Sequence, residues 1–269
     1  MKTIDSTAFS RERLHALWAI ELREDVRRYG LQLLIGLGVI LAIVLYMTYQ
    51  SNYSNENNYY SYDPVAGTET FLFPLGLFIM GCLSGTYISA PLGNKASAIS
   101  FLMIPASQQE KYITRLLIFV PGFFVAYMLG ITIIDLMHYL VAIIHGGSPS
   151  SIELAITKEP IVGDYKDAGI FYLAFFFLQS AFALGGAVWP KHGVLSSMGA
   201  GFVLGFVYSV VVNSIVAAMI FMNVDFWDPF DFSEDTVIAI CYAIGITAII
   251  TNYTLAYYRI KEAEIINRF

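Results

Sequence analysis

The sequence predicts an all-α integral membrane protein with six transmembrane helices, an amphipathic N-terminal helix at the membrane interface, and both termini in the cytoplasm. Three observations predict this fold class: an apolar composition, six long apolar runs, and basic residues on one side of those runs. The chain of 269 residues is 57% hydrophobic and 13% charged, with a mean hydropathy of +0.63. Soluble domains are about 25% charged, so we expect a membrane protein.

The apolar runs are each long enough to cross a membrane, because about 20 helical residues span a hydrocarbon core ~30 Å thick. The predicted spans are residues 30–49, 71–90, 116–144, 169–189, 194–222 and 236–258. They take up more than half of the chain and leave connections too short for an independent soluble domain. We therefore expect residues 1–269 to form a single transmembrane domain.

The first element is an amphipathic helix that leads into the first span. It places Leu14, Trp18 and Leu22 on one stripe, with Arg23 and Arg27 among the polar residues beside it. Such a helix can lie in the inner interface, with its apolar stripe in the lipid and its arginines at anionic headgroups. A helix that docks on a cytoplasmic partner, or a charged extension that only orients the first span, remains an alternative.

Basic residues give the orientation. A cytoplasmic N-terminus places the connections 91–115 and 190–193 and the C-terminus in the cytoplasm as well. All but two of the 15 Lys and Arg residues then lie inside, and the exceptions, Lys158 and Lys166, share the longest outer connection. This distribution follows the positive-inside rule.

The connection 91–115 is built from two predicted helices with a corner between them. A short surface helix over residues 96–104 is ended by Pro105. Ser107 and Glu110 then form a capping box, in which each residue's side chain accepts from the other's backbone amide. We expect a new helix to begin there and to run into the third span.

The stretch LMIPASQQEKYITRLL (102–117), together with the six-span layout and the N-terminal helix, resembles the permease subunits of type-2 ABC transporters, especially the short bacterial forms. In that family the connection between spans two and three is the coupling helix, which contacts a separate ATP-binding subunit. Family members usually also carry re-entrant helices on the outer side between spans five and six, where this chain offers only residues 223–235.

The resemblance implies a function and a set of partner-contacting residues. It implies the permease subunit of an exporter in the bacterial inner (cytoplasmic) membrane, acting as a homodimer or with a related permease, with no cofactor in this chain. The residues expected at the contact with the ATPase are Ile99, Leu102, Met103, Pro105, Ser107, Glu110, Lys111 and Arg115. The second function class is a non-transport scaffold, sensor or regulatory partner that uses the same surface.

We expect no catalytic site in this chain. It contains no His-Glu-x-x-His helix, no Gly-x-Ser-x-Gly elbow and no phosphate-binding loop. Cys82 and Cys241 fall within spans, where thiols act as small apolar side chains, so they predict no metal site or disulfide. We also expect no nucleic-acid partner.

Asp135 and His138 are a candidate intramembrane polar site. They lie one turn apart on the third span and should face the same way. Ionisable residues within a membrane are costly and often functional; this pair could bind a proton or orient each other. A structural role near the outer end of the span is the alternative, and an intramembrane enzyme is the weakest hypothesis.

Small residues predict close helix packing. Gly81 and Gly85 lie four apart in the second span, and Gly201 and Gly205 in the fifth. Small residues at this spacing let helix backbones approach in lipid. The second pair is also a candidate for a dimer interface.

Overall fold

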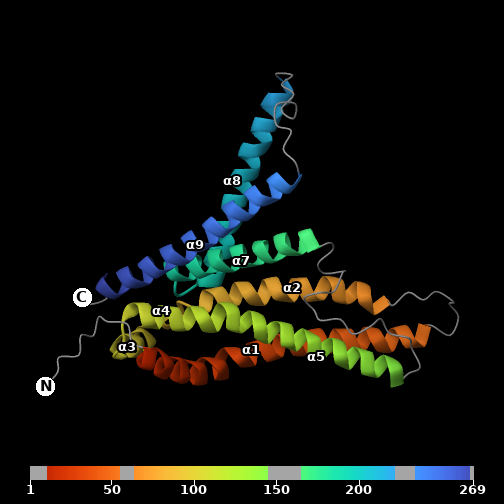
Figure 1. The fold of residues 1–269 in the computed structure, drawn as a ribbon, viewed down its shortest axis with the longest axis horizontal. Helices are drawn as coiled ribbons and strands as arrows, with labels where there is room; N and C mark the ends of the chain where they lie inside the picture. The colour runs from red at the N-terminus through yellow and green to blue at the C-terminus, as the bar shows by residue number, and fades with distance from the viewer. Residues whose placement is uncertain (1–10, 55–63, 145–164, 222–233, 267–269) are drawn as a thin grey trace.

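The computed structural model describes residues 11–54, 64–144, 165–221 and 234–266, and every regular element within these ranges is helical. In chain order the elements are α1 (Arg11–Ser54), α2 (Pro64–Tyr87), η2 (Ala90–Gly93), α3 (Lys95–Met103), α4 (Gln108–Leu117), η3 (Ile118–Gly122), α5 (Phe123–Ile144), α7 (Tyr165–Val188), α8 (Gly193–Phe221) and α9 (Glu234–Ile266). Figure 1 shows α1, α2, α5 and α7 side by side, with α9 running obliquely along α7.

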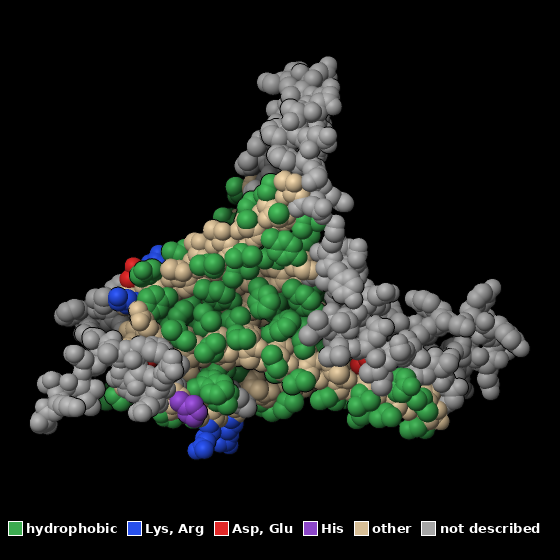
Figure 2. Space-filling view, in the orientation of Figure 1, with side chains coloured by type: hydrophobic (Ala, Val, Ile, Leu, Met, Phe, Trp, Pro, Cys, Tyr) green, Lys and Arg blue, Asp and Glu red, His purple; other side chains and the backbone are tan. Residues whose placement is uncertain are grey.

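Several of these helices can cross a membrane. Four stretches are long and apolar enough to do so: Tyr29–Gln50, Gln108–Ile144, Gly169–Val188 and Ile238–Glu262. Phe71–Tyr87 and Gly193–Val207 are shorter apolar helices. Figure 2 shows hydrophobic side chains covering most of the described surface on one face, as lipid contact requires. The predicted class, an all-α multi-pass membrane protein, is confirmed at this level.

α1 is one uninterrupted helix and not an interfacial helix followed by a separate span. Its 44 residues make it about 66 Å long at ~1.5 Å per residue. Gly30 is the only residue between the two predicted segments that weakens a helix, and glycine costs only about 1 kcal/mol. Tyr29, next to it, stacks on Tyr87 of α2 with ring centroids 4.1 Å apart. This contact holds α1 against α2 near the point where the two predicted segments join.

Two hydrophobic cores hold the bundle together. One lies among α1, α2, α5 and α7, with Leu77, Tyr127 and Phe175 at its centre. The other lies among α4, η3, α7 and α9 and contains Tyr112 and Ala256. α7 contributes to both, since it packs between α2 and α9.

α2 and α7 approach through their small residues, as the sequence predicts. A Cβ added at Gly85 would lie 2.5 Å from the carbonyl oxygen of Gln179 and 3.2 Å from the amide nitrogen of Ala183. A Cβ at Gly81 would meet the ring of Phe175 at 2.3 Å. Only glycine leaves room for the backbone of α7 at position 85. The close approach of α2 and α7 therefore depends on the absence of a side chain there.

The third predicted span contains a π-helical turn, η3, at Pro121. Within this turn Phe123 N–H donates to Ile118 O, five residues back, and not to Phe119 O, its partner in a regular α-helix. Side chains from neighbouring helices compensate: Gln179 Nε2 donates to Phe119 O at 3.1 Å, and Ser84 Oγ donates to the same oxygen. The turn at Pro121 is thus widened, and Phe119 O is bonded by side chains of α2 and α7.

α8 packs differently from the other long helices. Figure 1 shows it projecting away from the bundle, and Phe202 and Leu204 are largely exposed. A Cβ added at Gly201 or Gly205 would meet no described atom of another element within 4 Å. Gly201 and Gly205 therefore pack against nothing in the described part of this chain, whereas Ser197, nearer the start of α8, packs against Gly185 of α7.

We expect Gly85→Ala to destabilise the protein by about 1–3 kcal/mol, because the new methyl group overlaps backbone atoms that cannot rotate away. Gly38→Ala is the matched control, since the same methyl group meets open space and alanine favours a helix. Thermal unfolding of both detergent-solubilised variants checks this. Equal unfolding temperatures for the two variants would contradict the packing described here.

Candidate functional site

The α3–α4 corner begins with the capping box that the sequence predicts. Glu110 N–H donates to Ser107 Oγ at 3.3 Å, and Ser107 N–H donates to Glu110 Oε2 at 2.9 Å. Thr114 Oγ1 adds a bond to Glu110 O at 2.8 Å. The box starts α4 directly after the turn at Pro105, so the corner is fixed by local hydrogen bonds.

Lys111 fastens α3 to α4. Its Nζ donates to Leu102 O at 3.3 Å, near the C-terminal end of α3, and lies 5.3 Å from the centre of the Phe101 ring. A cation near the last carbonyls of a helix interacts favourably with the helix dipole. Because the ammonium is buried in this position, α3 is held against α4 on its inner face.

Arg115 joins the corner to α1 and α2. Its Nε donates to Ile88 O at 2.8 Å and its Nη2 to Tyr87 O at 2.9 Å, where α2 ends. Its Nη1 lies 3.2 Å from Glu21 Oε2 of α1, and both side chains are about 5% exposed. The planar guanidinium can make all these contacts at once. One buried side chain of α4 therefore joins this helix to α1 and to the end of α2.

The outer face of α3 is apolar and exposed. Ile99 is 59% and Met103 78% exposed, and Pro105 is exposed at the turn, whereas Leu102 is partly buried. Of the predicted partner-contacting residues, these four and Ser107 reach the surface. Glu110, Lys111 and Arg115 are buried and bond to the chain itself. They support the surface from within and do not present their side chains to a partner.

The predicted interfacial stripe lies beside an apolar groove. Trp18 and Leu22 are partly exposed and line a groove of about 480 Å³ between α1, α2 and η3. Arg23 and Arg27 are exposed, and the side chain of Leu14 lies outside the described part of the structure. The start of α1 packs on α4 through a different face.

That other face contains Leu17 and Glu21, both buried. Sequence reasoning missed them because they lie off the stripe, and a lone Glu among several charges gave no signal. Glu21 becomes part of the site only because Arg115, which is distant in the sequence, lies next to it in the folded protein.

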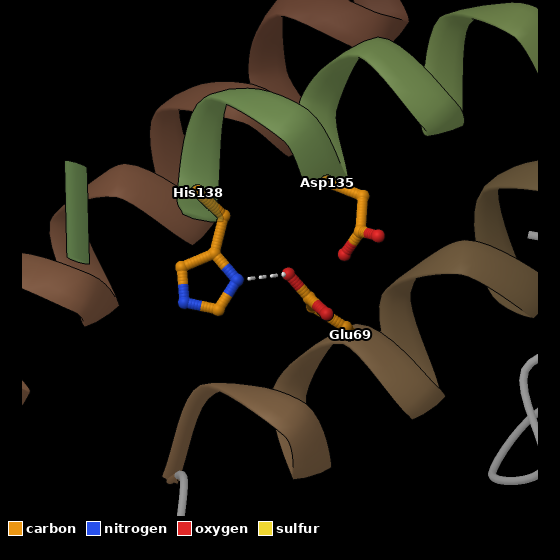
Figure 3. Close-up of side chains that lie close together, drawn as sticks. All are labelled: Glu69, Asp135 and His138. Atoms are coloured by element: carbon orange, nitrogen blue, oxygen red, sulfur yellow. Dashed lines mark ion pairs between the residues drawn. The ribbon is translucent and has the colours of Figure 1, made fainter. Parts of the chain in front are cut away.

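A second group of polar side chains is buried near the opposite end of the bundle. Asp135 and His138 point the same way from α5, as predicted, and Glu69 of α2 points at them (Figure 3). His138 Nδ1 lies 3.0 Å from Glu69 Oε1. One donor atom from each of the three residues lies within 4.8 Å of the others. Glu69 was not predicted because it precedes the predicted span; α2 begins earlier, at Pro64.

Comparison of the chain with models of protein families, with curated proteins and with solved structures gives no match.

We expect Arg115→Ala to lower the free energy of unfolding by about 3–5 kcal/mol, because it leaves Glu21 as a buried charge without its guanidinium. Arg259→Ala is the matched control. It breaks an ion pair with Glu262 that is largely exposed, and such pairs contribute at most about 1 kcal/mol. Chemical unfolding of the purified variants measures both, and similar losses would contradict the central position of Arg115.

Proposed function

We propose that this chain is the membrane permease subunit of an ABC-type exporter, driven by a separate ATP-binding subunit that docks on α3. The observation that carries the proposal is the α3–α4 corner. It combines an exposed apolar face at Ile99 and Met103 with a buried attachment through Lys111 and Arg115. A surface that receives force from a partner needs both features. The resemblance of residues 102–117 to the coupling segment of type-2 ABC permeases supports the same interpretation.

The proposed topology has six spans, formed by α1, α2, α4 to α5, α7, α8 and α9, with both termini in the cytoplasm. The arrangement of the helices supports it: the start of α1, the α3–α4 corner and the end of α9 lie at the same end of the molecule (Figure 1). The Lys and Arg side chains visible in Figure 2 gather in that half as well. Basic residues favour the cytoplasmic side of a membrane.

Coupling would proceed through the contacts of the corner. A displacement of α3 by the ATPase subunit passes to α4 through Lys111, and Arg115 transmits it to the ends of α1 and α2. α4 continues through η3 into α5. Movement at the cytoplasmic face thereby reaches the membrane-spanning helices without any ATP-binding motif in this chain.

We further propose that two copies, or this chain and a related permease, assemble in the bacterial inner membrane. Gly201 and Gly205 of α8 support this, because they offer a small-residue face that the described part of the chain leaves uncovered. The lipid bilayer covers the remaining apolar surface.

The proposal predicts that Ile99→Glu with Met103→Glu weakens binding of the ATPase subunit by about 10-fold or more, because burying a carboxylate in an apolar contact costs well over 1.4 kcal/mol. Ile99→Val with Met103→Leu is the matched control, which keeps the face apolar. The measurement is co-purification with a phosphate-loop ATPase encoded beside the gene, together with its ATP hydrolysis rate.

The outcomes separate the two function classes. Loss of binding and of ATPase stimulation in the glutamate variant alone supports the exporter. Stable binding of another protein without ATPase stimulation and without a substrate-linked phenotype would favour the scaffold or regulatory function. No association with any such ATPase would remove the exporter proposal.

A further inference from the structure

Glu69, Asp135 and His138 have the donor atoms and the spacing of a metal site. They come from two helices, and each is at most 5% exposed. Nδ1 of His138 and Oε1 of Glu69 are 3.0 Å apart, close to the ~3.4 Å between two ligands that each lie about 2.1 Å from a tetrahedral ion. Donor atoms of all three residues lie within 4.8 Å of one another, so small side-chain rotations suffice to bring them around one ion.

We propose that these three residues bind one divalent transition-metal ion of the Zn²⁺ type. Two carboxylates this close repel each other, and a doubly charged ion between them turns the repulsion into attraction. The imidazole determines the class of ion: Mg²⁺ and Ca²⁺ prefer oxygen ligands alone, whereas Zn²⁺ accepts imidazole and carboxylate together. Three protein ligands leave a fourth position for water or another donor.

The ion would join α2 to α5. Glu69 lies near the beginning of α2, and the other two ligands lie in the second half of α5. This is the end of the bundle opposite the α3–α4 corner (Figure 1). The inference rests on this geometry and is independent of the proposed export function.

The test uses full-length protein, purified in detergent with a tag that lacks histidine and stripped with a chelator. We expect about one equivalent of Zn²⁺ to bind, with Ca²⁺ and Mg²⁺ failing to compete. At Zn²⁺ concentrations ~100-fold above the dissociation constant, the unfolding midpoint should rise by about 5 °C or more. A wild-type protein that takes up no Zn²⁺, or that takes up Ca²⁺ in preference, overturns the proposal.

Variants then locate the ion. Glu69→Gln, Asp135→Asn and His138→Gln should each weaken Zn²⁺ binding at least ~100-fold, because even residues that only orient metal ligands cost 10–100-fold. Glu262→Gln and His192→Gln are matched controls at exposed positions and should bind Zn²⁺ like the wild type. Unchanged binding in the three ligand variants overturns the proposal.

A measurement on the wild type alone keeps the proposal testable if the variants fail to fold. Co²⁺ in a site of nitrogen and oxygen ligands gives visible absorption bands without a thiolate charge-transfer band. The absence of visible bands overturns the site. A thiolate band also overturns it, because it assigns the ion to Cys82 or Cys241, both free thiols.

Discussion

The buried guanidinium of Arg115 makes the contacts on which the arrangement of the α3–α4 corner depends. A charge in an apolar surrounding is costly unless it is paired and hydrogen-bonded. Arg115 meets this condition with two backbone carbonyls at the end of α2 and the carboxylate of Glu21 on α1. Such a group adds little net stability compared with a well-packed apolar side chain, but its directional donors fit only one arrangement of partners. It therefore specifies how α1, α2 and α4 meet.

Polar side chains serve the same purpose elsewhere in the bundle. Lipid is as apolar as the side chains it touches, so helices in a membrane gain little by burying apolar surface and depend on close packing and hydrogen bonds. The α2–α7 contact at Gly85 supplies the packing. Gln179 and Asn252 supply bonds between helices, to Phe119 O and Ser180 Oγ. Asn213, by contrast, bonds to Ser209 of its own helix, in the part of α8 that projects away from the bundle.

Features that depend on neighbouring residues in the sequence could be predicted. The helices, the end of α3 before Pro105 and the capping box at Ser107 all follow from local hydrophobicity and local hydrogen bonds. The burial of Lys111 and Arg115 could not be predicted from the sequence. A basic residue at the end of a span is also typical of the exposed membrane interface.

Partners that come together only in the folded bundle were missed for a related reason. Glu21 and Glu69 carry no motif, and each becomes part of a site only because another helix lies next to it. Whether Glu69 lies on α2 also depends on where this helix begins. The sequence carries no strong signal for that N-terminus. Asp225, Asp228 and Asp231 are carboxylates that could together ligate a calcium ion, although they match no EF-hand spacing. They lie outside the described residues.

The positions of the two buried polar groups bear on how motion could pass through the protein. Lys111 bonds α4 to α3, and the multiple, directional bonds of Arg115 join α4 to α1 and to the end of α2, so α3 and α4 should move together. Farther along the same span, η3 has a widened turn, and Pro121 lacks the amide that would stiffen it. α5 can therefore change its angle to α4 at η3 more easily than α4 can separate from α3. An ion at Glu69, Asp135 and His138 would tie the far end of α5 to α2. A displacement of α3 would then bend the span at η3, between the α3–α4 corner and this ion.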